Sequence, residues 1–167
     1  MLTLTAGQAE AKAAAEAEAV DEADAAILAD NSKATDVFIS GVKGVNSVIN
    51  GLYSPTQETG QDGRILYRKS GESGDKALCI GHDDGKCWEV KDALDIGRDV
   101  CPRAFVRGGC ALEECCSRLW CVYDGKDHVD QPGVKVVTGD EAKSMASSHS
   151  TLAPQCSPSL TSMLSRV

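Results

Sequence analysis

Residues 118–125 read Arg-Leu-Trp-Cys-Val-Tyr-Asp-Gly, and this stretch decides the fold that the sequence predicts. Its aromatic and β-branched residues alternate with period two, which indicates a strand. Trp120 and Val122 therefore project to one face of that strand, and the residues between them project to the other. The closing Asp-Gly pair supplies the positive φ angles of a tight turn.

A related arrangement occurs earlier, where residues 84–90 read Asp-Gly-Lys-Cys-Trp-Glu-Val, and a third Asp-Gly pair precedes the strand-like residues 64–69. Turns of this kind between alternating strands are typical of a meander of hairpins. The fold class predicted is mainly β: a small antiparallel meander or partly open barrel with one or two short helices. Because aromatic residues make up only 4% of the chain, we expect most of the rings inside. The predicted core is Tyr53, Tyr67, Trp88, Val90, Trp120 and Val122.

The ends of the chain differ from its middle in composition. Residues 1–35 are alanine-rich and acidic and predict a helical arm over residues 6–30, either a solvated tail or a helix that docks along a partner. Residues 36–140 form the β domain, with its first strand expected from residue 36 and running, with glycine bulges, to residue 53. Residues 141–167 are serine-rich and predict an arm that is disordered when free.

Charge and hydropathy argue against two classes of partner. Eight acidic residues against two lysines in residues 1–36 account for six of the eight net negative charges, so the β domain is nearly neutral. A nucleic-acid partner would require clustered lysine and arginine, which the sequence lacks. No apolar run approaches the ~20 residues needed to span a bilayer, so we expect no membrane span.

Cysteine is the strongest chemical signal in the sequence, with eight residues in all. No Cys-x-x-Cys pair occurs, and the usual zinc patterns are absent, so no metal or other cofactor is predicted. Two interpretations remain open: at least one disulfide, or reduced thiols that fill the core as small apolar groups. The candidate disulfide cysteines, which cluster in sequence, are Cys110, Cys115, Cys116 and Cys121.

No catalytic residue is predicted. His82 and His128 fall in polar turn or loop segments and are expected to be solvated rather than paired with a cysteine nucleophile. Glu113 and Glu114 are adjacent, so their carboxylates diverge. An alternative function is a small-molecule or glycan-binding domain, in which exposed rings on a β face stack on the ligand.

Four motifs carry a resemblance to a known group of proteins: residues 49–56, 63–69, 86–91 and 120–125. In these the chain resembles a small β domain that recurs, sometimes in tandem, in dinoflagellate and other algal proteins. The motifs mark strands and turns, so the resemblance implies a fold and no catalytic assignment.

The same resemblance implies an accessory subunit of a large plastid complex, of which dinoflagellate photosystem I with its antenna proteins is the example. The chain would then lie in the plastid, peripheral to the thylakoid membrane, with the cytoplasm as the alternative compartment. The function predicted is a non-enzymatic structural subunit whose β domain and terminal arms dock on other protein subunits.

Overall fold

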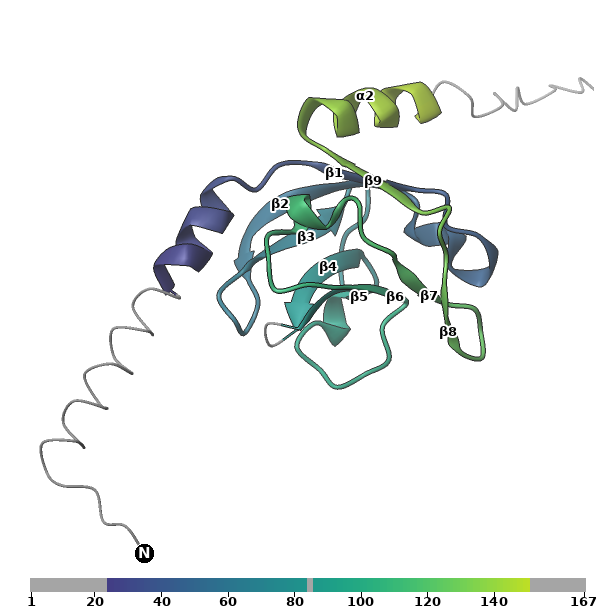
Figure 1. Ribbon diagram of the computed structural model, residues 1–167, viewed down its shortest axis with the longest axis horizontal. Helices are drawn as coiled ribbons and strands as arrows, with labels where there is room; N and C mark the ends of the chain where they lie inside the picture. The colour runs from purple at the N-terminus through teal and green to yellow at the C-terminus, as the bar shows by residue number, and fades with distance from the viewer. Residues whose placement is uncertain (1–23, 84–85, 151–167) are drawn as a thin grey trace, which may run out of the picture.

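The computed structural model describes residues 24–83 and 86–150 of the chain (Figure 1). Within these residues, nine strands form one antiparallel sheet that curls into a half-barrel. The mainly β fold predicted from the sequence is confirmed. The elements are β1 (Val37–Ser40), η1 (Gly44–Ile49), β2 (Gly51–Thr59), β3 (Ile65–Lys69), β4 (Leu78–Asp83), β5 (Cys87–Asp92), η2 (Ala93–Asp95), β6 (Ala104–Arg107), η3 (Leu112–Cys115), β7 (Cys121–Tyr123), β8 (His128–Asp130), β9 (Lys135–Thr138) and α2 (Gly139–Ser150), where η marks a 3-10 helix.

The strand order is a meander with one long return. Strands β1 to β8 lie beside their neighbours in sequence, and β9 returns to pair with β1 on its other side. Each pair is antiparallel, the arrangement that allows tight turns to join neighbouring strands, as between β7 and β8. In the β4–β5 hairpin, for example, Asp83 lies opposite Cys87 and Ile80 lies opposite Val90.

The core lies on the concave side of the curled sheet. Trp88 and Trp120 are 2% and 1% exposed, and in strands such as β6 alternation turns one residue in two toward the core. In β6, for instance, Ala104 and Val106 are buried while Phe105 faces outward. All six residues that the sequence placed in the core belong to one buried cluster: Tyr53, Tyr67, Trp88, Val90, Trp120 and Val122.

The connection between β1 and β2 and the segment after β7 differ from the sequence-based expectation. The first strand stops at Ser40, and η1 separates it from β2, because Gly41 adopts a φ of 82° and turns the chain. The side-chain amide of Asn50 closes this turn by bonding both N and O of Val42, each at 2.9 Å. A further strand, β8, lies in the segment expected to be a polar loop, where it pairs with β7.

The part of the N-terminal arm that the structure describes is helical over residues 24–32 and lies against the β domain. Asn31 attaches it: its Nδ2 donates to Gly63 O and its Oδ1 accepts from Ile65 N, both at 2.9 Å. Arg64 adds an ion pair with Asp30 at 3.0 Å. Most of the helix expected over residues 6–30 lies outside the described residues.

The C-terminal arm begins differently from the disordered tail that its composition predicts. Residues 139–150 form α2, which lies across β1, β2 and β9 (Figure 1). Ala142 of α2 is fully buried, and the ring of His149, also on α2, lies 5.3 Å from that of Phe38. The expectation was wrong here because Phe38 gives a polar helix an apolar ring to cover. Residues 151–167 lie outside the described part.

None of the helices described is both long and apolar enough to cross a bilayer.

Candidate functional site

The outer face of strands β5 to β8 is the most distinctive surface of the domain. Because side chains alternate along a strand, Phe105 projects away from the core. Its cross-strand neighbours are Glu89 on β5 and Cys121 on β7, and Cys121 is in turn opposite Asp130 on β8. One row of outward side chains therefore crosses four strands.

A small aromatic group lies beside this row. The ring of His128 is 5.1 Å from that of Phe105, edge-on, and 5.5 Å from that of Tyr123. Nε2 of His128 lies 2.9 Å from the backbone oxygen of Pro102, which fixes the ring against the sheet. His128 is therefore half-buried in a strand, and the expectation of a solvated loop residue was wrong.

Two shallow hollows flank Phe105. One holds about 500 Å³ and the other about 440 Å³, and Phe105 and Arg107 line both. Leu119, which lines the first, is 50% exposed. We call this surface the Phe105 face, and it comprises Lys86, Cys87, Glu89, Pro102, Phe105, Arg107, Arg118, Leu119, Cys121 and Asp130.

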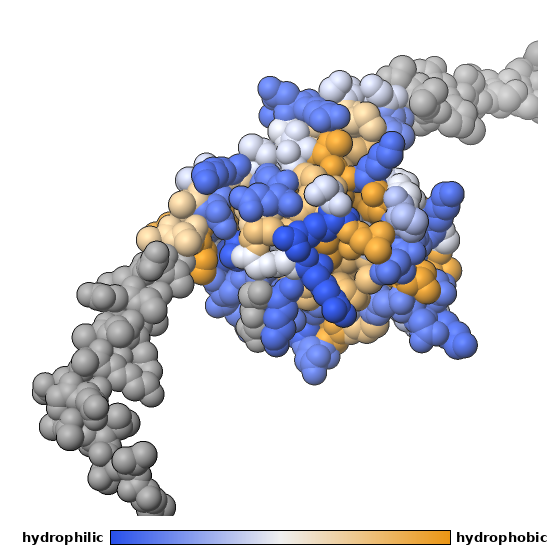
Figure 2. All heavy atoms as spheres, viewed as in Figure 1, coloured by the Kyte–Doolittle hydropathy of each residue, from blue (hydrophilic) through white to orange (hydrophobic). Residues whose placement is uncertain are grey.

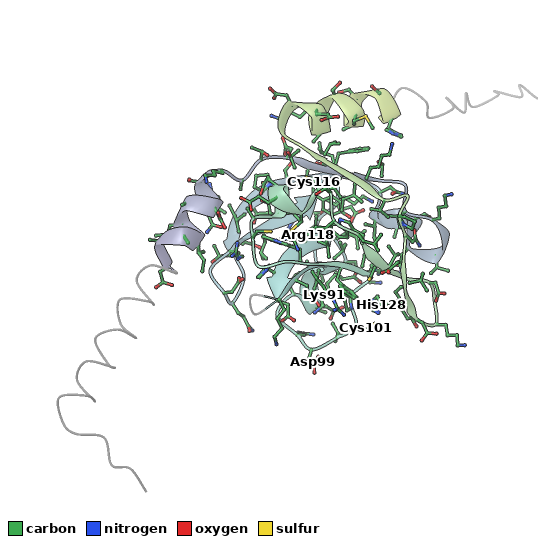
Figure 3. All side chains as sticks on the ribbon, viewed as in Figure 1. Lys91, Asp99, Cys101, Cys116, Arg118 and His128 are labelled. Atoms are coloured by element: carbon green, nitrogen blue, oxygen red, sulfur yellow. The ribbon has the colours of Figure 1, made fainter. Side chains whose placement is uncertain are left out.

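Figures 2 and 3 show the side of the molecule on which Arg118, one residue of the Phe105 face, is labelled. Figure 2 shows hydrophobic side chains that run from beneath α2 across the middle of the molecule and are interrupted by hydrophilic ones. In Figure 3, Arg118 and Cys116 lie on the segment that crosses the front of the domain, and His128 and Cys101 lie lower in the view. The mixture of apolar and charged groups is that of a surface patch, not of a closed pocket.

Thiols on the Phe105 face are held in the protonated form. Burial and the neighbouring Asp130 raise the pKa of Cys121 to about 11, and the Cys121 thiol donates a hydrogen bond to Asp130 Oδ1 at 2.8 Å. Burial and the carboxylates of Glu89 and Asp83 likewise raise the pKa of Cys87 to about 11. Since the thiolate is the nucleophile, neither cysteine is activated for catalysis.

The candidate disulfide cysteines are all free thiols, as are the other cysteines that the structure describes. Cys110 and Cys115 nevertheless lie in contact, with their sulfur atoms 3.4 Å apart. Cys116 turns its thiol to Glu113 O at 2.9 Å instead. The structure therefore brings the sulfur atoms of two of the four into contact, whereas the thiols of Cys116 and Cys121 bond to oxygen atoms.

His82 is buried, so the expectation of an exposed turn histidine was wrong. Its ring packs edge-on against Trp88 at 4.9 Å. Nδ1 lies 2.6 Å from Asp62 Oδ2, and Nε2 lies 3.0 Å from Gly108 O. Sequence reasoning missed this arrangement because Asp62 and Gly108 are remote from His82 in the chain.

One group of possible metal ligands is present in the described residues. Atoms of Asp83, Cys87 and Glu89 lie within 4.8 Å of one another at the end of the β4–β5 hairpin. Lys91 Nζ already lies 2.5 Å from Glu89 Oε2 and neutralises it. The hairpin register could have indicated this group, because it sets Asp83 opposite Cys87.

The interior offers little room for a ligand. Hollows beside the core hold about 20 Å³ near His82 and about 10 Å³ near Trp88, which is space for about one water molecule. Both tryptophans are covered, so they do not present a face to a sugar.

Glu113, one of the two adjacent acidic residues, accepts hydrogen bonds from Tyr67 Oη at 2.8 Å and Thr35 N at 3.1 Å, which assigns it a structural role.

Comparison with models of known families, with curated proteins and with solved structures found no match to this chain.

Proposed function

We propose that this chain is a non-enzymatic interaction domain that docks on other protein subunits of a larger assembly through the Phe105 face. The observation that carries the proposal is the contrast between a filled interior and a hollowed outer face. Trp88 and Trp120 occupy the inside, whereas hollows of about 500 and 440 Å³ lie outside, on either side of Phe105.

The composition of the Phe105 face supports a protein partner. Aromatic and arginine side chains are enriched where protein interfaces bury most of their binding energy. Phe105 is half-buried and central, Arg107 and Arg118 lie beside it, and Leu119 adds an exposed apolar group. Asp130, on the edge strand β8, suits the charged rim of an interface.

The terminal arms are a second part of the proposal. Their described portions, the helix at residues 24–32 and α2, pack on the β domain itself. Contacts of the arms with other subunits are therefore proposed for residues 1–23 and 151–167, which lie outside the described part. The resemblance to an algal β domain suggests a plastid assembly, photosystem I with its antenna proteins, as the first one to test.

A small-molecule or glycan-binding domain is the second candidate. The observation that favours it is the aromatic group of Phe105, Tyr123 and His128 on the outer face, since surface rings can stack on a sugar. It shares the Phe105 face with the first candidate, so the two are distinguished by what binds there.

Site-specific photo-crosslinking tests the proposal. A photoreactive amino acid is introduced into the full chain at Leu119 and, as a matched control, at Leu94, which is 51% exposed and is not part of the Phe105 face. With algal plastid extract, position 119 should give one discrete protein adduct and position 94 should give none. Equal adducts at both positions, or none at position 119, would contradict a protein-docking role for this face.

The binding affinities of point variants for the crosslinked protein test the same proposal. Leu119→Ser should weaken binding to the crosslinked protein by about tenfold, the effect of losing about 1.4 kcal/mol at an interface, whereas Leu94→Ser should leave binding unchanged. The second candidate would be supported instead if the chain bound a glycan array, if Phe105→Ala abolished that binding, and if position 119 gave no protein adduct.

A further inference from the structure

Cys110 and Cys115 form a contact that the proposed docking role does not use. Their sulfur atoms are 3.4 Å apart, and a bond between them requires about 2.05 Å. Only a small shift therefore separates the contact from a covalent bond. The two residues are five apart in sequence, so closing the loop between them costs little additional chain entropy.

The surrounding structure holds both thiols near this position. On one side, the indole nitrogen of Trp88 donates to the backbone oxygen of Cys110 at 3.0 Å. On the other, η3 is anchored by Leu112, which is fully buried, and by Glu113, which accepts the hydroxyl hydrogen of Tyr67. Cys115 itself is fully buried at the end of η3.

The other described thiols have different neighbours. Cys116 and Cys121 donate to oxygen atoms, Glu113 O and Asp130 Oδ1. Cys79 is the second residue of β4, Cys87 contacts Glu89 Oε1 at 3.7 Å, and Cys101 contacts Pro102 O at 3.8 Å. Within the part of the chain that the structure describes, Cys110 and Cys115 are the pair of cysteines whose sulfur atoms contact each other.

We propose that Cys110 and Cys115 are an oxidisable dithiol and that a reversible disulfide forms between them. The oxidant is a small-molecule disulfide, such as oxidised glutathione. The thiolate of one cysteine attacks the oxidant and forms a mixed disulfide, releasing one small-molecule thiolate. The second cysteine then attacks the protein sulfur of that mixed disulfide and expels the other small-molecule thiolate. Two protein thiols are oxidised, one disulfide is reduced to two thiols, and the two protons pass to the released thiolates.

The environments of the two sulfurs assign the order of attack. Cys110 is half-buried and meets the oxidant, whereas Cys115 is fully buried and resolves the mixed disulfide. Burial, followed by the hydrogen bond with Cys110, raises the pKa of Cys115 to about 12. Because only the thiolate attacks, we expect bridge formation to be slow at neutral pH and to accelerate as the pH rises.

The test uses the full chain with oxidised glutathione, followed by digestion with a protease that cleaves after glutamate. Cleavage after Glu113 or Glu114 separates Cys110 from Cys115, so a bridge appears in mass spectrometry as two linked peptides. The expected result is a linked pair that disappears on addition of dithiothreitol and forms faster at higher pH.

Three variants assign the bridge. Cys110→Ser should abolish the linked pair, and so should Cys115→Ala, whereas Cys116→Ser should retain it, because Cys116 faces Glu113 O. Because Cys110 is half-buried, we expect Cys110→Ser to fold. If Cys115→Ala does not fold, Cys110→Ser still tests the proposal. Glutathione adducts on Cys110 without linked peptides, no reaction at either cysteine, or loss of the bridge in Cys116→Ser would each overturn the proposal. None of these outcomes depends on whether the Phe105 face binds a partner.

Discussion

The indole nitrogen of Trp88 donates a hydrogen bond to the backbone oxygen of Cys110 at 3.0 Å. This bond ties β5 to the segment that leads into η3, so it connects the sheet to the long connection between β6 and β7. The other tryptophan differs: Trp120 Nε1 is buried and has no hydrogen-bond partner among the described residues. Two interior rings of similar burial therefore differ in one polar contact.

The two tryptophans make a matched pair for measuring that contact. Trp88→Phe and Trp120→Phe both remove part of a buried ring, but only Trp88→Phe also leaves the oxygen of Cys110 without its donor. We expect Trp88→Phe to lower the free energy of unfolding by about 1 kcal/mol more than Trp120→Phe. Urea unfolding followed by circular dichroism measures the difference. Equal losses would mean that the bond contributes nothing net.

The turn at Gly41 should tolerate no side chain. Its φ is 82°, and a Cβ placed there would lie 2.1 Å from the backbone oxygen of Gly133. Gly71 is the matched control, since its φ is 83° and nothing lies within 4 Å of an added Cβ. Gly71→Ala should cost about 1 kcal/mol for the left-handed backbone alone, and Gly41→Ala about 1–3 kcal/mol more for overpacking. Similar urea midpoints for the two variants would show that the contact with Gly133 relaxes without cost.

Asn31 should determine whether the N-terminal helix stays attached to the sheet. Asn31→Ala removes both of its bonds to the backbone of Gly63 and Ile65, at a cost of about 1 kcal/mol for the pair of contacts. Hydrogen exchange of the Ile65 amide, which donates to Asn31, should accelerate by about fivefold. Ser32→Ala is the control, because the Ser32 hydroxyl bonds only to Ala29 O within the helix. Unchanged exchange in Asn31→Ala would show that other contacts hold the helix.

The reactivity of Cys121 should depend on its neighbour Asp130. With a pKa of about 11, the Cys121 thiol is protonated at neutral pH, and its alkylation rate rises as the pH approaches that value. Asp130→Asn removes the negative charge that favours the protonated form, so the pKa should fall and alkylation at pH 8 should be about three- to tenfold faster. Iodoacetamide labelling read by mass spectrometry measures this. A rate that does not change would assign the raised pKa to burial alone.

Local periodicity accounts for how well the strands were predicted. Residues 118–125 form a strand only at Cys121–Tyr123, yet the side that carries Trp120 and Val122 is buried as expected, because alternation is a property of the extended backbone itself. The same holds for the β4–β5 hairpin, in which Cys87 and Trp88 lie beside β4 in the expected antiparallel pairing. By contrast, β8 and α2 were missed, since their residues are polar and gain their order from contacts with β7 and Phe38.

Alternation and turn chemistry in the sequence were therefore enough to determine an antiparallel β domain and which aromatic rings lie inside it, because these features depend on neighbours in the chain. Only the tertiary structure decided that β9 returns beside β1, that His82 meets Asp62, that Cys110 contacts Cys115, and that Phe105 lies between two hollows. These features depend on how the sheet curls and how side chains from separate strands pack, and no local pattern of residues specifies that geometry.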